Sequence, residues 1–147
     1  MPKCSDVMTR DPICCEPGDS VTQVAEVMKD KNVGSLPVVE SQQFRRLVGI
    51  VTDRDLVTKV VAGGLNVAST SVRDAMTANP SCCREDEDVD RAVSMMAERQ
   101  VRRMPVVDGS GHLKGIIAQA DVATRVRRDD KTGEMVEAIS EPSSRHS

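Results

Sequence analysis

Two stretches of the chain place apolar residues at helical spacing. Both follow the i, i+3, i+4, i+7 pattern of a helix with one apolar face, at Val21, Val24, Ala25 and Met28 and again at Val89, Ala92, Val93 and Met96. Ser20 precedes the first stretch and Asp88 the second, and both residue types cap helix N-termini. The pattern therefore predicts two amphipathic helices, each beginning after a polar cap.

Short apolar runs around these helices predict β-strands. One run precedes each helix and two follow it: 13–15, 36–39 and 47–51 in the first half, and 81–83, 104–107 and 113–118 in the second. The short loop between the second and third runs favours a hairpin, whereas the intervening helix favours parallel pairing of the first and second runs. A further helix should begin near Arg54, and another near Ala120. Each half is thus predicted to be β-α-β-β-α.

The two halves are copies of one unit. A shift of 68 residues superposes Asp6, Met8, Thr9, Pro12, Cys14, Cys15 and Pro37-Val38-Val39 on Asp74, Met76, Thr77, Pro80, Cys82, Cys83 and Pro105-Val106-Val107. The shift then falls to 66, so that Gly49 and Asp55 meet Gly115 and Asp121. A register held over this length indicates an internal repeat. We predict repeats over 5–62 and 72–127, a connector over 63–71, and a polar, flexible tail over 128–147.

One repeat alone would leave a face of its sheet uncovered. We therefore expect the two repeats to pack sheet to sheet in a single domain of the α/β (α+β) class. Phe44 is the one aromatic residue, so the chain lacks the aromatic platforms on which single-stranded nucleic acids stack. With a net charge of −3, nucleic acid is not an expected partner. The sequence shows neither a bilayer-length apolar run nor a secretory signal, so we expect no membrane partner, a cytoplasmic location and reduced cysteines.

The densest polar cluster follows the third predicted strand of the first repeat. Thr52 and Asp55 suit the cap and first turn of a helix, which is a structural role. The same geometry can bind a ligand, because N–H groups at a helix start attract phosphate and a carboxylate can accept both hydroxyls of a ribose. The residues alone leave both roles open. In the second repeat Ala118 stands in place of Thr52, whereas Asp121 keeps the carboxylate.

The order, spacing and duplication of the motifs resemble a pair of CBS domains, also called a Bateman module. The motifs are the Met-Thr-x-x-Pro openings, the x-x-Pro-Val-Val strands and the Gly-h-h-Thr-x-x-Asp ending, in which h is apolar. The resemblance covers about 5–127. It implies repeats packed with pseudo-two-fold symmetry, with clefts for an adenosine-containing effector such as AMP, ADP, ATP, NAD or S-adenosylmethionine, and no required cofactor. It also implies a homodimer that regulates another protein in trans, because the chain carries no effector domain.

The resemblance assigns three groups of site residues. Asp55 and Asp121 would bind the ribose, and Thr52, Arg54, Arg102 and Arg103 the phosphate. The adenine pocket would be lined by Pro12, Ile13, Cys14, Val33 and Gly34 in the first repeat and by Pro80, Ser81, Cys82 and Val101 in the second. Because Ala118 has no hydroxyl, we expect the Asp55 site to bind more strongly than the Asp121 site. Arg102 and Arg103 also suit the end of a helix, where cations complement the dipole, and this alternative stays open.

Catalytic and metal sites are not expected. The sequence offers no central His, no nucleophile with a base and no Gly-rich phosphate loop, so we expect no enzyme activity. Neighbouring residues on a strand point to opposite faces, so the two Cys-Cys pairs are expected to fill the core rather than to hold a metal. The alternative to a ligand sensor is a ligand-free interaction or dimerisation module, which no adenosyl ligand would stabilise.

Overall fold

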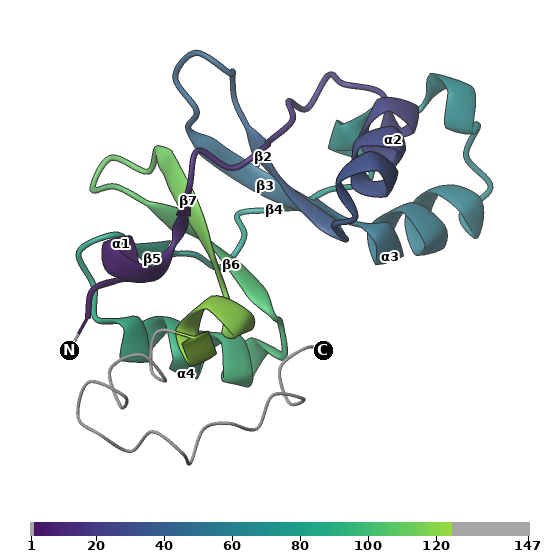
Figure 1. The fold of residues 1–147 in the computed structure, drawn as a ribbon. Helices are drawn as coiled ribbons and strands as arrows, with labels where there is room; N and C mark the ends of the chain where they lie inside the picture. Colours follow the sequence, from purple (N-terminus) through teal and green to yellow (C-terminus); the bar gives the residue numbers. More distant parts are fainter. Residues whose placement is uncertain (1, 125–147) are drawn as a thin grey trace. The chain divides into compact units, whose positions relative to one another are not determined.

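The chain folds as two compact units that both combine helices and strands. The computed structural model describes residues 2–124, and the predicted tail over 128–147 lies outside the described residues. Unit 1 comprises residues 2–11, 81–108 and 114–124, and unit 2 comprises residues 12–80 and 109–113 (Figure 1). Each unit contains one sheet, which confirms the predicted α/β (α+β) class.

Unit 2 is built on a three-stranded antiparallel sheet of order β2-β3-β4. Its strands are β2 (Ser35–Val39), β3 (Leu47–Thr52) and β4 (Thr77–Ala78). The pairing of β2 with β3 confirms the predicted hairpin. The predicted first strand is reduced to a parallel bridge between Cys15 and Val38.

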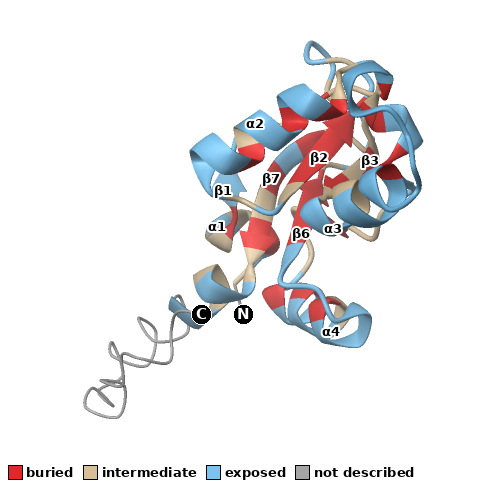
Figure 2. Cartoon of the chain, turned by 90° about the vertical axis from the view of Figure 1, so that its right-hand side faces the viewer, coloured by how far each residue is buried: buried red, intermediate tan, exposed pale blue. Residues whose placement is uncertain are grey.

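Helix α2 (Val21–Lys31) closes the core of unit 2. Ser20 caps it as predicted, because the Ser20 hydroxyl accepts the Gln23 N–H at 3.0 Å. Figure 2 shows buried and exposed residues alternating along α2 and along its counterpart in unit 1. The predicted apolar stripe is buried except at Ala25, which lies on its edge and is exposed.

The segment after β3 is helical but irregular. A short α3 (Asp53–Asp55) continues as a π-helical turn, η1 (Leu56–Val61), so the helix begins one residue before the predicted Arg54. Two 3₁₀ turns follow, η2 (Val67–Ser69) and η3 (Val72–Asp74). Ser71, at the end of the predicted connector, forms an isolated bridge with Ser20.

Unit 1 is built on a four-stranded sheet of order β1-β7-β6-β5. Its elements are α1 (Cys4–Val7), β1 (Thr9–Arg10), β5 (Cys83–Arg84), α4 (Val89–Arg99), β6 (Arg103–Val107) and β7 (Leu113–Ala118), and residues 119–124 are helical. The parallel pairing of β5 with β6 confirms the expected crossover. Asp88 holds the predicted N-cap position of α4 but makes no side-chain cap; its carboxylate instead lies 3.5 Å from the Lys3 ammonium.

Each sheet includes a short strand from the opening segment of the other repeat. β1, from the start of the first repeat, pairs with β7, and β4, from the start of the second repeat, pairs with β3. Each compact unit therefore contains segments of both predicted repeats, 5–62 and 72–127. Two-residue strands carry no readable periodicity, so the sequence gives no signal for this exchange.

Candidate functional site

Thr52 and Asp55 form a reciprocal capping box where β3 ends and α3 begins. The Thr52 hydroxyl accepts the Asp55 N–H at 3.0 Å, and a carboxylate oxygen of Asp55 accepts the Thr52 N–H at 3.0 Å. The predicted capping role is therefore confirmed. Neither bond uses the hydroxyl proton of Thr52, and a hydroxyl can donate one hydrogen bond while it accepts another. The cap thus leaves Thr52 able to donate to a ligand.

The carboxylate of Asp55 is held at both of its oxygens. One accepts the Thr52 N–H, and the other lies 3.2 Å from the Lys59 ammonium, one helical turn further on. Lys59 is itself positioned by a bond of 3.1 Å to the Ala75 carbonyl. Each carboxylate oxygen has about two lone-pair directions, so each can still accept a ligand hydroxyl. The carboxylate of Asp55 is thus held in a fixed orientation, and its role in binding a ribose stays a prediction.

Strand β2 brings Gly34 against the same helix start. The Asp53 N–H donates to the Gly34 carbonyl at 2.9 Å, and Ser35 is the sheet partner of Thr52. A Cβ at Gly34 would lie 3.0 Å from an Asp53 carboxylate oxygen, so a side chain at this position would crowd the helix start. The structure therefore gathers four of the predicted residues at one end of the hairpin: Val33, Gly34, Thr52 and Asp55.

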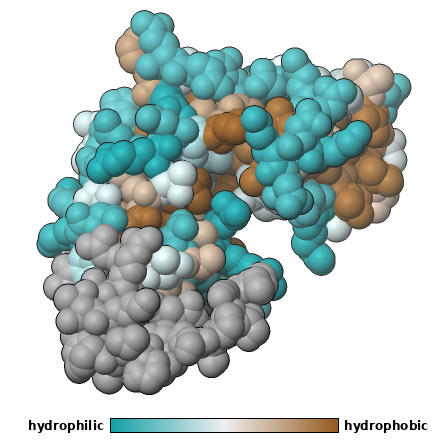
Figure 3. Space-filling view, in the orientation of Figure 1, coloured by the Kyte–Doolittle hydropathy of each residue, from teal (hydrophilic) through white to brown (hydrophobic). Residues whose placement is uncertain are grey.

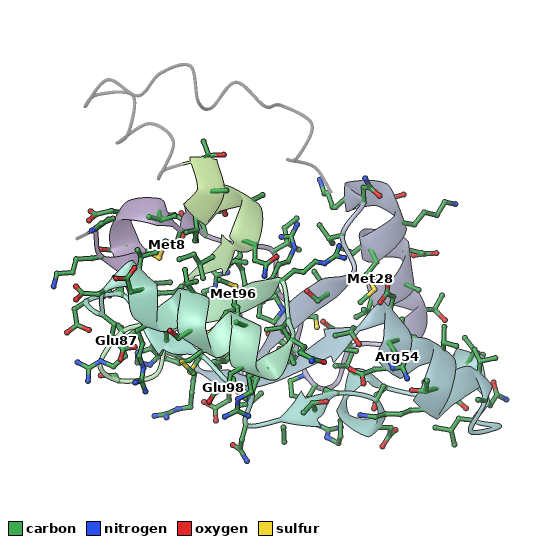
Figure 4. All side chains as sticks on the ribbon, turned by 90° about the horizontal axis from the view of Figure 1, so that it is seen from below. Met8, Met28, Arg54, Glu87, Met96 and Glu98 are labelled. Carbon is green, nitrogen blue, oxygen red and sulfur yellow. The ribbon has the colours of Figure 1, made fainter. Side chains whose placement is uncertain are left out.

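Arg54 is exposed on α3, where Asp53 and Asp55 flank it in the sequence (Figure 4). Its backbone carbonyl accepts the Thr58 hydroxyl at 2.8 Å, which fixes the first helical turn. The helix start thus carries both signs of charge, and the phosphate role of Arg54 stays a prediction.

The predicted adenine segment Pro12 to Cys14 is held by the loop of the hairpin. The Arg45 guanidinium donates to the Pro12 carbonyl at 2.6 Å and lies 3.3 Å from the Cys14 sulfur. The Gln42 amide donates to the Cys14 carbonyl at 2.9 Å. These contacts lie at the loop end of β2 and β3, whereas Thr52 pairs with Ser35 at the other end. Ile13 is 47% exposed, so its side chain remains open to contact.

Sequence reasoning did not identify Arg45 and Gln42. One signal could have pointed to them: the change of offset from 68 to 66 shows that this loop is longer in the first repeat than its counterpart in the second. The extra length lets side chains of the loop reach back to the segment before Cys15.

The second repeat reproduces the backbone of the site without the hydroxyl. The Ala118 N–H donates to an Asp121 carboxylate oxygen at 3.3 Å, so half of the capping box remains. The Gln119 N–H donates to the Arg102 carbonyl at 2.9 Å, as Asp53 does to Gly34 in the first repeat. Arg102 and Arg103 are both exposed. The structure thus places Asp121 and Arg102 at one junction and leaves the phosphate role of the arginines a prediction.

The remaining predicted residues of this repeat come before and after α4 in the sequence. Val101 is 38% exposed, and its N–H closes the end of α4 by donating to the Met96 carbonyl at 2.9 Å. Pro80, Ser81 and Cys82 precede β5 and are half-buried. Their role in an adenine pocket stays a prediction.

The paired cysteines alternate between buried and half-buried positions, as neighbouring strand residues do. Cys15 and Cys83 are buried, whereas Cys14 and Cys82 are half-buried. Burial raises the pKa of Cys15 to about 12 and also raises that of Cys82, so these thiols stay protonated near neutral pH. Within residues 2–124 no group of three or more His, Cys, Asp or Glu side chains could hold a metal ion. In the same range, no helix has the length and apolar character needed to cross a membrane.

The chain belongs to the CBS-domain family. The family model for the CBS domain matches residues 4–62 and again residues 72–128, so it covers both repeats. The uncharacterized protein YlbB of Bacillus subtilis is 39% identical over 145 residues, which span 99% of this chain and 96% of that protein. Hypoxic response protein 1 of Mycobacterium tuberculosis is 30% identical over 118 residues, which span 80% of each chain.

Two solved structures are similar to this fold. A crystal structure of Hypoxic Response Protein I with two coordinated zinc ions has a TM-score of 0.75 at 29% identity, and covers 83% of this chain and 97% of its own. The CBS-pair protein CBSX2, known from Arabidopsis thaliana, has been solved in complex with AMP. That complex has a TM-score of 0.77 at 26% identity, and covers 88% of this chain and 99% of its own. The fold and the duplication are therefore those of a CBS pair.

Proposed function

We propose that this CBS pair is a regulatory sensor that binds an adenosine-containing ligand at the Thr52–Asp55 junction. The observation that carries the proposal is the Asp55 carboxylate, which is oriented by Thr52 and Lys59 and keeps an acceptor direction on each oxygen. A ribose presents two adjacent hydroxyls that such a carboxylate can accept together. The AMP complex of CBSX2, at 26% identity, supports the same ligand class.

The phosphate of the ligand would be bound by the start of the helix that follows β3. Thr52 supplies a hydroxyl proton, and Arg54 a guanidinium that can donate two parallel hydrogen bonds to phosphate oxygens. The N–H groups of Asp53 and Asp55 already donate to Gly34 and Thr52, so beyond these side chains the helix start adds only the positive partial charge of its dipole. ATP, ADP and AMP differ in charge at this point, so the affinity for each should follow the contribution of Arg54.

The Asp121 junction would be the weaker of two unequal sites. Ala118 supplies no hydroxyl, and a missing bond to a charged phosphate is worth about 1.5–3 kcal/mol. Asp121 retains one capping contact, at 3.3 Å, compared with 3.0 Å for the equivalent contact of Asp55. This site would favour a ligand without phosphate at that position, unless Arg102 or Arg103 replaces the lost interaction.

Occupancy would be transmitted through an exposed apolar face of unit 2. The face consists of Val57, Val61, Leu65 and Val67, which are 43% to 66% exposed. Val57 and Val61 are four residues apart on the helix that starts at the site, and Figure 3 shows brown apolar surface over this part of unit 2. We propose that the face packs against a second copy of the chain or a regulated partner in the cytoplasm. A ligand shifts this equilibrium only if it binds one arrangement more tightly than the other.

The same apolar face supports the second candidate, a ligand-free interaction module. Thermal unfolding in the presence of AMP, ADP, ATP, NAD or S-adenosylmethionine separates the two functions. A ligand at 100 times its dissociation constant adds about 2.7 kcal/mol to the free energy of unfolding, and so raises the melting temperature. A rise with at least one of the five supports the sensor, with GMP as the control for a generic effect of nucleotide charge. An unchanged melting temperature with all five rejects the sensor and leaves the interaction module.

A further inference from the structure

Two buried thiols from distant parts of the sequence touch in the core of unit 1. The sulfur of Cys4, in α1, lies 3.6 Å from the sulfur of Cys83, in β5. Their residues are 0% and 1% exposed. A disulfide requires an S–S distance of about 2.05 Å, so each sulfur would need to move by about 0.8 Å. Movements of this size can be made by side-chain rotation together with small backbone shifts.

The contact divides the two thiols into a more acidic and a less acidic member. Their mutual hydrogen bond lowers the pKa of Cys4, although burial and the carboxylates of Glu87, Asp88 and Asp86 act in the opposite direction. The same hydrogen bond raises the pKa of Cys83, and burial raises it further. Cys4 is therefore the sulfur that ionises first, while Cys83 retains its proton. This order matters for oxidation, because the thiolate is the nucleophile that attacks the oxidant.

Cys4 lies in a short helical segment near the start of the chain. Helix α1 has four residues, too few to be stable by itself, and it is docked by backbone bonds. The Cys4 N–H donates to the Glu87 carbonyl at 2.8 Å, and the Ser5 N–H donates to the Glu85 carbonyl at 3.0 Å. Figure 4 marks Glu87, two residues before the start of α4. Local opening of such a segment admits a small oxidant, and closing returns Cys4 to Cys83, which stays in the sheet.

We propose that Cys4 and Cys83 are a redox modification site that forms an intrachain disulfide with hydrogen peroxide as oxidant. The Cys4 thiolate attacks one peroxide oxygen, the O–O bond breaks, and the leaving hydroxide takes a proton to become water. The Cys4 sulfenic acid is then attacked by the Cys83 sulfur; the S–O bond breaks, and the departing hydroxide leaves as water with the Cys83 proton. Two thiols lose two electrons, and the peroxide is reduced to two waters. The bond joins the start of the chain to the second repeat.

The test is a peptide map of the reduced full chain after treatment with hydrogen peroxide and alkylation of the remaining thiols. The expected product is a Cys4–Cys83 cross-linked peptide that dithiothreitol releases. The oxidised chain should also unfold at a higher urea concentration than the reduced chain, because the cross-link closes a long loop in the unfolded state. Neither readout requires a variant or a bound nucleotide.

Matched variants identify the pair. Cys83→Ala should abolish the cross-link, and Cys82→Ser, a change at the neighbouring half-buried thiol, should leave it intact. Three results would overturn the proposal: free Cys4 and Cys83 after Cys14 and Cys82 have been oxidised, a cross-link between chains, or a cross-link that persists in Cys83→Ala.

Discussion

Gly115 lies so close to the Thr9 carbonyl that a Cβ at position 115 would be 2.6 Å from that oxygen. The other repeat contains the same relationship, because a Cβ at Gly49 would be 2.9 Å from the Thr77 carbonyl. In each case the glycine belongs to a central strand, and the carbonyl belongs to the short strand taken from the other repeat. These glycines therefore make the exchange of opening strands possible.

Gly115→Ala is predicted to destabilise unit 1. The new methyl group would also meet the Met8 sulfur at 2.7 Å, so both backbone and core must shift, at a cost of about 1–3 kcal/mol. Urea denaturation measures the change. Gly18→Ala is the control, because nothing lies within 4 Å of a Cβ at that position. Equal unfolding midpoints for the two variants would contradict the packing described for β1 and β7.

Thr52→Ala should affect stability and ligand binding separately. Loss of the cap should lower the free energy of unfolding by about 1 kcal/mol, and Thr52→Ser should restore it. Loss of the hydroxyl should also weaken AMP binding by about tenfold or more, but should leave adenosine, which has no phosphate, nearly unaffected. Calorimetric titration with both ligands measures this difference. Equal weakening for AMP and adenosine would assign Thr52 a structural role alone.

The buried Cys15 thiol predicts a loss of stability at high pH. Its pKa is raised by burial from 9.0 to about 12, so the folded state binds the thiol proton more tightly than the unfolded state does. The stabilisation is complete below pH 9 and is lost as the pH rises from 9 to 12. Cys15→Ala should remove this contribution and give a shallower decline of the unfolding free energy in that range. Parallel curves for the wild type and the variant would show that Cys15 does not couple to folding.

The exposed apolar face of unit 2 predicts self-association. Val61 is 66% exposed, so Val61→Lys should dissociate a dimer formed through this face with little effect on folding. Phe44→Lys is the matched control, because Phe44 is 64% exposed but lies in the hairpin loop. Sedimentation equilibrium measures the mass of each variant. A monomeric wild type, or a dimer that survives Val61→Lys, would exclude this face as the dimer interface.

Sequence periodicity predicted the long elements well but could not resolve short or edge features. Helix α2 is capped by the predicted Ser20 and buries most of its apolar stripe, whereas Val93 of α4, at the edge of the equivalent stripe, is 40% exposed. Whether a residue at the edge of a stripe is buried depends on which element packs beside it. The hydrophobic pattern of a single segment carries no information about that neighbour. The exchanged strands β1 and β4 have two residues each, too few to show an alternation.

The candidate site could be predicted where its residues are close together in the sequence. Thr52 and Asp55 are three residues apart, and a capping box follows from that spacing. Lys59 is one helical turn from Asp55 and could have been identified by the same reasoning. Arg45 could not, because its contact with Pro12 depends on the path of a loop 33 residues away.

The most direct test of the sensor is a calorimetric titration of AMP into the wild type, Asp55→Asn and Asp121→Asn. Asparagine keeps the size of the side chain and an oxygen for the Thr52 N–H, but loses the charge that pairs with Lys59 and one oxygen for the ribose. We predict that Asp55→Asn weakens binding by about tenfold or more, and that Asp121→Asn has a smaller effect. A wild type that binds no AMP, or equal losses in the two variants, would contradict an unequal pair of nucleotide sites.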